Sequence, residues 1–297
     1  MDITTDVTGL KLRNPTILAA GILGSTASSI KRSIRGGAGA VVTKSIGVVP
    51  REGHQGPVMI KTEHGFLNAM GLANPSYHEF KREVKESKGE VPIVVSIFGG
   101  NAEEFKEVAL GLIDANPDAF ELNVSCPHAE GYGVDIGEDP KAVENITKAV
   151  KKAVNVPVWV KLSPLTNIVK IGLAAQRGGA DAVVAINTIP AMAIDTESCF
   201  PVLGNTSGGL SGAAIKPVAL KCVYDLYNAL KIDIIGVGGI SSWTDAIEFI
   251  MAGASAIEIG SAVYEDIRIF QHISEGISRY LQNKGFELDD IRGVAVK

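Results

Sequence analysis

Short runs of apolar residues recur along the chain, and most of them are rich in the β-branched residues Val and Ile. Each run leads into a polar residue or a glycine, and most are followed by a longer stretch with apolar residues every three or four positions. We expect the runs to be strands buried on both faces and the longer stretches to be helices that cover them. The eight runs are 16–21, 40–45, 93–100, 119–126, 158–163, 181–188, 234–240 and 256–262.

This alternation predicts a parallel sheet with helices on its outer side. The clearest helical stretches are 101–115, 139–154, 167–179 and 241–254. Eight strand–helix units predict a (β/α)8 TIM barrel, because a doubly wound sheet, the alternative, does not require so regular a count. In the last helical stretch, Ser242 and Asp245 resemble a capping box. The segment 3–15 precedes the first strand, and we expect it to form a hairpin that caps the barrel bottom.

The composition is that of an ordinary globular protein. The chain has 297 residues, of which 46% are hydrophobic and 21% charged, and no Pro/Ser-rich linker divides it. We therefore expect residues 1–297 to form a single domain. The net charge of −5 argues against nucleic-acid or anionic membrane surfaces as partners. The first residues lack the apolar core of a secretory signal, and no apolar run approaches the ~18 residues of a membrane span. These features predict a cytoplasmic protein.

The cysteines exclude several kinds of site. The chain has three, Cys126, Cys199 and Cys222, which are widely spaced and form no CxxC motif. This pattern argues against a disulfide framework, a zinc site and an iron–sulfur cluster within this chain. A function that requires such a cluster therefore needs a partner subunit.

The strand ends carry the candidate chemistry, because active sites of such barrels form at the carboxyl ends of the strands. We expect no pair of acidic residues at these ends, which disfavours glycoside hydrolysis, and no His/carboxylate cluster for a catalytic metal. The side chains and glycines at the eight ends are Ala20–Gly21, Lys44–Ser45, Ser96, Asn123 with Cys126, Lys161, Asn187–Thr188, Gly238–Gly239 and Gly260–Ser261.

Two of these features suggest a bound anion. Glycine pairs follow the seventh and eighth strands, where barrels commonly hold a phosphate on backbone N–H groups, and Gly212 precedes another helix. Alternatively, such glycines only allow helices to pack closely on strands. Lys44 and Lys161 occur within apolar strands, where burial disfavours a charge that no anion compensates. The alternative is that each lysine extends to solvent.

Cys126 allows three interpretations. It is a buried apolar residue, a metal ligand, or a group that moves protons. Its place at a strand exit, three residues after Asn123 and before Pro127, favours the third. Cys199 and Cys222 have no such setting, and we expect them to be structural.

Taken together, the motifs resemble the flavin-dependent dihydroorotate dehydrogenases, and most closely the class 1B catalytic subunit. The resemblance covers nearly the whole chain. The order of NAMGLANP (68–75), NVSCP (123–127) and GGLSG (208–212) is especially specific. Further similar motifs are NPTILAAG, TKSIG, VWVKLSP, AINT with MAID, and IIGVGGISSWTDAIEFIMAGASAIEIGSA.

This resemblance implies a role for each matching residue. Cys126 would be the catalytic base. The residues implied to bind FMN are Ala20, Gly21, Lys44, Ser45, Ser96, Asn123, Lys161, Ile186, Gly212, Gly238, Gly239, Gly260 and Ser261, the last five around its phosphate. The residues implied to bind substrate are Lys44, Asn68, Ala69, Met70, Gly71, Leu72, Asn123, Asn187 and Thr188. No metal is implied.

The implied reaction is the FMN-dependent oxidation of dihydroorotate to orotate in pyrimidine biosynthesis. One departure leaves an alternative open, because His128 stands where the family usually has Asn after Cys-Pro. A Cys-Pro-His sequence also occurs in dihydropyrimidine dehydrogenases, so a reductase of uracil- or thymine-type rings is the second hypothesis. The NAMGL stretch at 68–72, which that group lacks, favours dihydroorotate.

The resemblance also implies partners. A class 1B catalytic subunit would form a homodimer core and pair with a subunit that carries FAD and an iron–sulfur cluster, with NAD as final acceptor. A fumarate acceptor, as in the class 1A enzymes, is the alternative.

Overall fold

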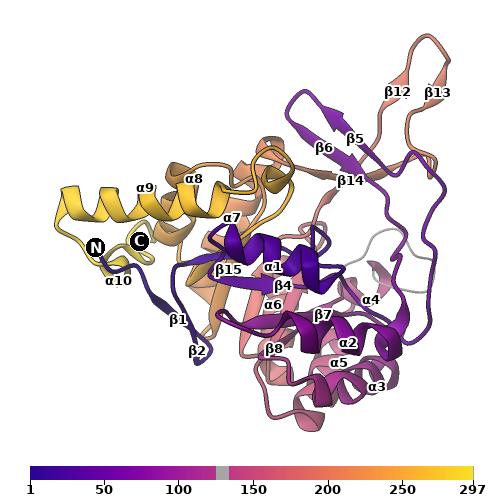
Figure 1. Ribbon diagram of the computed structural model, residues 1–297, viewed down its shortest axis with the longest axis horizontal. Coiled ribbons are helices and arrows are strands. Elements are labelled where there is room, and N and C mark those ends of the chain that lie inside the picture. The colour runs from indigo at the N-terminus through magenta and orange to yellow at the C-terminus, as the bar shows by residue number, and fades with distance from the viewer. Residues whose placement is uncertain (125–133, 297) are drawn as a thin grey trace.

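Eight parallel strands close into a barrel (Figure 1). The computed structural model describes residues 1–124 and 134–296. The barrel strands are β3 (Thr16–Leu18), β4 (Ala40–Val42), β7 (Ile93–Ile97), β8 (Ala119–Asn123), β9 (Val158–Leu162), β10 (Ala182–Ala185), β15 (Asp233–Val237) and β16 (Ala256–Ile259). Each pairs with the next along the chain, and β16 closes the barrel on β3. All eight expected strands are present, so the predicted (β/α)8 barrel is confirmed.

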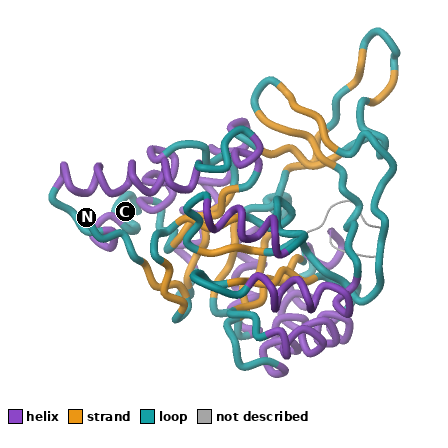
Figure 2. Tube along the Cα trace, viewed as in Figure 1, coloured by secondary structure: helices purple, strands orange, loops and turns teal. Residues whose placement is uncertain are grey.

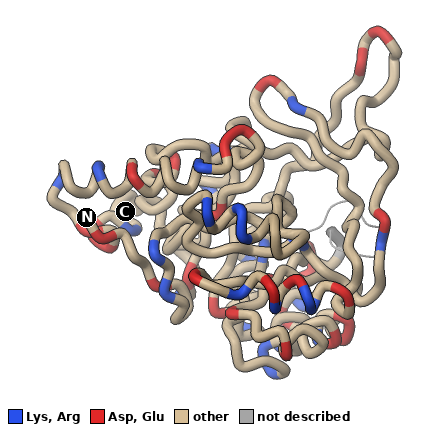
Figure 3. Tube along the Cα trace, in the orientation of Figure 1, with Lys and Arg blue, Asp and Glu red and all other residues tan. Residues whose placement is uncertain are grey.

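A helix follows every barrel strand and lies on the outside (Figure 2). These helices are α1 (Ala27–Arg35), α2 (Ser76–Ser87), α3 (Ala102–Leu112), α5 (Pro140–Ala153), α6 (Ile168–Gly178), α7 (Lys216–Ala229), α8 (Trp243–Met251) and α9 (Ile269–Lys284). The short elements are α4 (Val134–Glu138), α10 (Leu288–Ile291) and the 3₁₀ turns Ile113–Ala115, Ala213–Ile215 and Ser261–Tyr264. Charged residues of both signs are spread over the helices and loops (Figure 3). Within the described ranges, no helix is long and apolar enough to cross a membrane.

Local sequence signals set the helix ends. Ser242 caps α8 by accepting a hydrogen bond from the backbone N–H of Asp245, as the sequence predicts. Asp139 caps α5 in the same way through Lys141, and Pro140 occupies the first position, where its missing N–H has no helical partner to lose. Helix α8 begins after the loop that follows β15, so its cap also fixes where this loop ends.

The N-terminal hairpin closes the bottom of the barrel. Strand β1 (Thr5–Val7) pairs with β2 (Leu10–Leu12), and Val7 packs with the apolar side chains of the barrel interior. The buried Trp159 of β9 belongs to the same cluster, and its indole N–H donates to the hydroxyl of Thr8 in the hairpin turn at 3.0 Å. The predicted hairpin is therefore confirmed. It fills the end of the barrel opposite the carboxyl ends of the strands.

A second sheet extends from the barrel (Figure 1) and was not expected from the sequence. It has the order β11–β14–β6–β5, all antiparallel, and a further hairpin joins β12 to β13. Its members are β5 (Met59–Thr62), β6 (Gly65–Asn68), β11 (Ile189–Ala191), β12 (Ile194–Asp195), β13 (Phe200–Pro201) and β14 (Gly208–Ser211). These strands are two to four residues long and mix apolar residues with glycine, proline and polar residues, so they are too short to show the apolar alternation that marks a strand in sequence.

Candidate active site

A cavity of about 430 Å³ lies where the barrel strands end and the second sheet begins. One part of its wall comes from residues at the carboxyl ends of the strands, such as Lys161 of β9 and Gly260 after β16. Another part comes from the β5–β6 hairpin, including Phe66 and Asn68. The cavity therefore occupies the position at which barrels of this class build their active sites.

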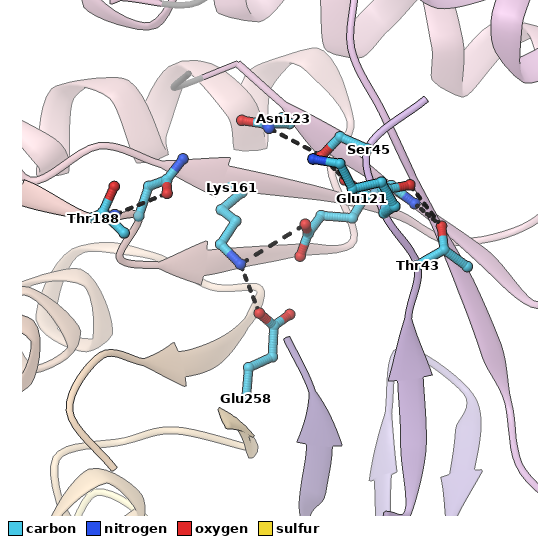
Figure 4. A network of polar contacts seen from close by, with 10 residues as sticks. Thr43, Ser45, Glu121, Asn123, Lys161, Thr188 and Glu258 are labelled. Atoms are coloured by element: carbon cyan, nitrogen blue, oxygen red, sulfur yellow. Dashed lines mark hydrogen bonds and ion pairs between the residues drawn. The ribbon is translucent and has the colours of Figure 1, made fainter. Parts of the chain in front are cut away.

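Lys161 lies on the cavity floor between two carboxyl groups (Figure 4). Its Nζ atom is 2.8 Å from Oε2 of Glu258 and 3.9 Å from Oε1 of Glu121. The Lys161 side chain is 7% exposed, and both glutamate side chains are 0% exposed. Alternation along the strands explains this meeting, because Glu121 lies two residues before Asn123, which pairs with Lys161 across β8 and β9.

Burial shifts the protonation of this cluster. It raises the pKa of Glu121 well above the ordinary value of 4.5, and the nearby Glu258 carboxylate raises it further. Burial alone lowers the pKa of Lys161, but the charges of Glu121 and Glu258 more than offset this effect, and the net shift is upward. Lys161 is therefore a cation at the base of the cavity.

A chain of hydroxyl and amide groups runs beside this cluster. The Asn123 Nδ2 atom donates to Oγ of Ser45 at 3.1 Å, and Ser45 Oγ lies 2.9 Å from Oγ of Ser96. The Ser96 backbone N–H in turn donates to the Thr43 hydroxyl. These contacts, drawn in Figure 4, link three neighbouring strands and fix the orientation of the Asn123 amide.

Glycines form another part of the cavity wall. Gly212, Gly238 and Gly239 have φ values of +96°, +128° and +76°, which favour glycine. A Cβ atom on Gly239 would lie 2.8 Å from the carbonyl oxygen of Gly212, so no other residue fits here without a shift. Because these residues have no side chains, they leave their backbone open to the cavity.

The first turn of α8 supports the loop that carries these glycines. Asp245 of α8 accepts from Lys216 Nζ at 2.7 Å, from the Ser241 backbone N–H at 3.0 Å and from the Ser242 hydroxyl at 2.8 Å. Burial raises the pKa of Asp245, but these hydrogen bonds outweigh it and hold the pKa below the ordinary value of 3.8. The carboxylate thereby ties the loop after β15, which carries Gly238 and Gly239, to the start of α7.

The structure brings nearly all predicted site residues to this one cavity. Those that line it are Ala20, Gly21, Lys44, Ser45, Asn68, Met70, Gly71, Leu72, Asn123, Lys161, Ile186, Asn187, Thr188, Gly212, Gly238, Gly239, Gly260 and Ser261. Ser96 and Ala69 are fully buried and do not line it. Cys126 and His128 lie outside the described residues. The binding roles remain predictions, since the cavity shows proximity alone.

The expectation that no acidic pair lies at the strand ends is wrong. Glu258 lines the cavity and Glu121 lies beside it, both inside strands and two residues before the exits that we considered. The signal was present in the two-residue alternation, which places Glu121 on the face of Asn123 and Glu258 on the face of Gly260. Among the described residues, no group of His, Cys, Asp and Glu side chains is arranged to hold a metal ion.

Sequence comparison agrees with this geometry. The dihydroorotate dehydrogenase family matches residues 2–281, so the chain belongs to that family. It is 63% identical over 297 residues to the dihydroorotate dehydrogenase B (NAD(+)) catalytic subunit of Methanocella arvoryzae, covering 99% of this chain and 98% of the relative. It is 51% identical to the subunit of the same name from Pyrococcus horikoshii, covering 97% of this chain and 96% of the relative.

A solved structure shows the same fold. The dihydroorotate dehydrogenase of Eimeria tenella, determined in complex with ferulenol, superimposes with a TM-score of 0.87 at 20% identity, covering 99% of this chain and 88% of that one. The chain is thus an oxidoreductase of the (β/α)8 class. Its reaction is the oxidation of dihydroorotate to orotate in pyrimidine biosynthesis, and the pyrimidine reductase hypothesis is not favoured.

Proposed function

We propose that the chain acts as one FMN-binding domain in which the cavity holds FMN and dihydroorotate together, with Cys126 as the base. The observation that carries this proposal is the lining of the cavity, which combines a buried lysine and amide side chains with bare glycine backbone. A ligand with an electron-rich ring at one end and a phosphate at the other suits these two kinds of lining.

The described residues fit the two ends of FMN. The backbone of Gly212, Gly238 and Gly239 is uncovered, and N–H groups in such turns bind phosphate well. Lys161 is a buried cation suited to the electron-rich edge of the ring. Gly260 and Ser261, at the start of a 3₁₀ turn, complete the proposed phosphate site.

The amide side chains suit a dihydropyrimidine ring. Such a ring alternates N–H and C=O groups, and a carboxamide offers both donors and an acceptor. Asn68 of β6 lines the cavity from the second sheet, and Asn123 and Asn187 line it from the ends of barrel strands. Mismatched buried groups would cost about 1–3 kcal/mol each, so this set discriminates among rings. Lys44 and Gly71 are our candidates for the substrate carboxylate.

Oxidation of the ring removes a hydride from one carbon and a proton from its neighbour. Bound FMN supplies the hydride acceptor. We propose that Cys126 takes the proton from the opposite face of the substrate, because a thiol with an ordinary pKa of about 8.5 is partly ionised at mildly alkaline pH. Ser45 holds the Asn123 amide in place beside this reaction.

The remaining proposals concern the fate of the electrons. The relatives are named catalytic subunits of NAD-linked enzymes. We therefore propose a homodimer core that pairs with a subunit carrying FAD and an iron–sulfur cluster, with NAD as final acceptor. The expected cytoplasmic location stays a prediction.

Anaerobic flavin reduction tests the proposal. The purified protein is mixed with dihydroorotate and, separately, with dihydrouracil, and flavin bleaching is followed. We expect rapid bleaching by dihydroorotate alone, and a roughly 10²–10⁴-fold slower rate in Cys126→Ala with FMN retained. Cys199→Ala, at an exposed cysteine, is the matched control and should keep the normal rate. Bleaching by dihydrouracil alone, or normal rates in Cys126→Ala, would contradict the proposal.

A further inference from the structure

The cluster at the cavity floor contains more negative than positive formal charge. Glu121 and Glu258 together would carry two negative charges, and Lys161 carries one positive charge. All three side chains are at least nine-tenths buried. A net charge in such a place is costly, because the interior cannot replace the hydration that a carboxylate loses.

The neighbouring polar groups do not compensate a second carboxylate. Neither oxygen of Glu121 has a hydrogen-bond partner among the described residues, and the same holds for Oε1 of Glu258. The hydroxyl of Ser96, which contacts that of Ser45, also lies close enough to Glu121 to lower its pKa slightly. An ionised Glu121 would therefore have only this neutral group and the 3.9 Å contact with Lys161 to stabilise it.

Other charged groups lie in more exposed positions than the three members of the cluster, so solvent screens their charges more strongly. Besides the cluster, the charged or titratable side chains that line the cavity are Lys44, Lys61, Glu63, His64, Tyr264 and Glu265. The last five are exposed, so water screens the charges among them, and Lys44 is half-buried. Asp233, the remaining charged residue of the barrel strands, begins β15 at the opposite end, where it accepts from Ser255 and from the backbone of Thr8.

We propose that Glu121 and Glu258 share a single proton, so that Lys161 belongs to a buried cluster of zero net charge. Two like carboxyl groups in one dry site behave as a pair that releases its protons in separate steps. A proton on Glu121 provides a donor, and the unpartnered Oε1 of Glu258 provides an acceptor. The raised pKa of Glu121 agrees with this arrangement.

The shared proton gives a function to Glu121 and Glu258, which the sequence did not single out. The effect of this proton on the cofactor rests on the proposed binding of FMN. Glu121 and Glu258 are positioning residues, since they act through Lys161. The shared proton keeps the floor neutral. If the proton were lost, an added negative charge would oppose an electron-rich ring above Lys161.

If the proton is shared, replacing one glutamate by glutamine should not change the net charge of the cluster. In Glu121→Gln the remaining Glu258 ionises as the partner of Lys161, and in Glu258→Gln the remaining Glu121 does so. Either single change leaves the cluster at zero charge. Only the double change leaves Lys161 unpaired and raises the charge by one.

Infrared spectroscopy of the purified protein tests the sharing directly. At about pH 8 exposed carboxyl groups are ionised, so the carbonyl stretch of a protonated acid stands out. We expect one such band in the wild type and none in either single variant. Subtracting the spectrum of a variant from that of the wild type removes the bands of the flavin, which both contain. Asp114→Asn, at an exposed carboxyl paired with Lys81, is the control and should keep the band. A wild type without the band, or a single variant that retains it, would overturn the proposal.

A second measurement tests the effect on the cofactor. The affinity for reduced FMN relative to oxidised FMN should be unchanged in both single variants. In the double variant it should rise by roughly ten- to a hundredfold, the effect of a unit charge acting over several ångströms in a protein. A tenfold shift in Glu121→Gln alone would contradict a shared proton. If the chain binds no flavin, the infrared result still decides the sharing, so the two proposals fail separately.

Discussion

The Oγ atom of Ser96 lies 2.9 Å from that of Ser45, although only Ser45 lines the cavity. Ser96 is fully buried in β7, and Ser45 lies just after β4, the strand next to β7 in the barrel. Because Ser45 also accepts from Asn123, the buried hydroxyl acts on the cavity through two other side chains. Ser96 is thus a positioning residue.

Replacing Ser96 by Ala should loosen this chain of hydrogen bonds. One neutral hydrogen bond contributes about 0.5–1.5 kcal/mol, which corresponds to a roughly 2- to 10-fold lower kcat/KM for dihydroorotate. Steady-state kinetics with a saturating acceptor measures it. Ser33→Ala removes another buried hydroxyl, in α1, and should leave kcat/KM unchanged. Equal losses in both variants would indicate a general loss of stability.

Asp245 should contribute more to stability and to FMN binding than Glu248, the other acidic residue that contacts Lys216. Asp245→Asn weakens the hydrogen bonds from Lys216 and Ser242 that support the glycine wall. We expect a loss of about 1–2 kcal/mol in unfolding free energy and weaker FMN binding, as for bonds to a charged group. Glu248→Gln is the control, since Glu248 also contacts Lys216, at 2.9 Å, but is 46% exposed. FMN titration that gives equal affinities for both variants would contradict this role.

The direction of the pH effect at Asp245 follows from its lowered pKa. The folded state binds the Asp245 proton more weakly than the unfolded state does. The ionised Asp245 carboxylate therefore stabilises the folded protein fully at pH values above the ordinary pKa of 3.8. It is lost as the pH falls through the lower, folded-state value. The difference in stability between the wild type and Asp245→Asn should therefore shrink in strong acid, which acid titrations of both proteins followed by circular dichroism would measure.

The barrel was predictable because its strands are buried on both faces. Runs such as 158–163 are nearly continuous apolar segments, as strands of a parallel sheet are, and their alternation with longer helical stretches separates them from helices. The second sheet was not predictable, because β14 consists of Gly208, Gly209, Leu210 and Ser211 and pairs with β6 far away in the chain. Pairing of such strands depends on tertiary contacts rather than on local pattern.

The candidate site was predictable at the strand exits and not inside the strands. Lys161 stood out because a lysine is unusual in an apolar run, and it lies on the cavity floor as expected. Glu121 and Glu258 could not be predicted from the strand exits, because both lie inside strands. Whether two buried acids meet depends on barrel register, which brings β8 and β16 to the two sides of one lysine.

The stability of Glu121→Gln should depend on pH in the opposite sense to Asp245→Asn. The folded pKa of Glu121 is raised, so the native wild type binds an additional proton above the ordinary value of 4.5. The wild type should therefore lose stability relative to Glu121→Gln as the pH rises from about 4.5 toward the folded value, by at most ~1.4 kcal/mol per pH unit. Urea unfolding of both proteins across this range measures the difference. Parallel curves would show that Glu121 ionises normally.

Removing the cation of the cluster should be the most damaging of these changes. In Lys161→Met the apolar stem is largely retained, but one carboxylate of the Glu121–Glu258 pair stays buried without a counter-charge. Breaking a buried pair in this way costs about 3–5 kcal/mol, and we expect a loss of that size in the free energy of urea unfolding at about pH 8. Flavin content is measured in each sample, because bound ligand adds stability.

A second substitution separates charge from packing at Lys161. In Lys161→Met combined with Glu258→Gln, the remaining Glu121 is protonated and the cluster is neutral again. Most of the lost stability should then return, because replacing a whole buried charge cluster by neutral groups is far less costly than leaving one charge alone. Flavin reduction should stay impaired, since the cation beneath the proposed ring is still missing. A double variant as unstable as Lys161→Met would mean that packing of the lysine stem, rather than an unpaired charge, accounts for the loss.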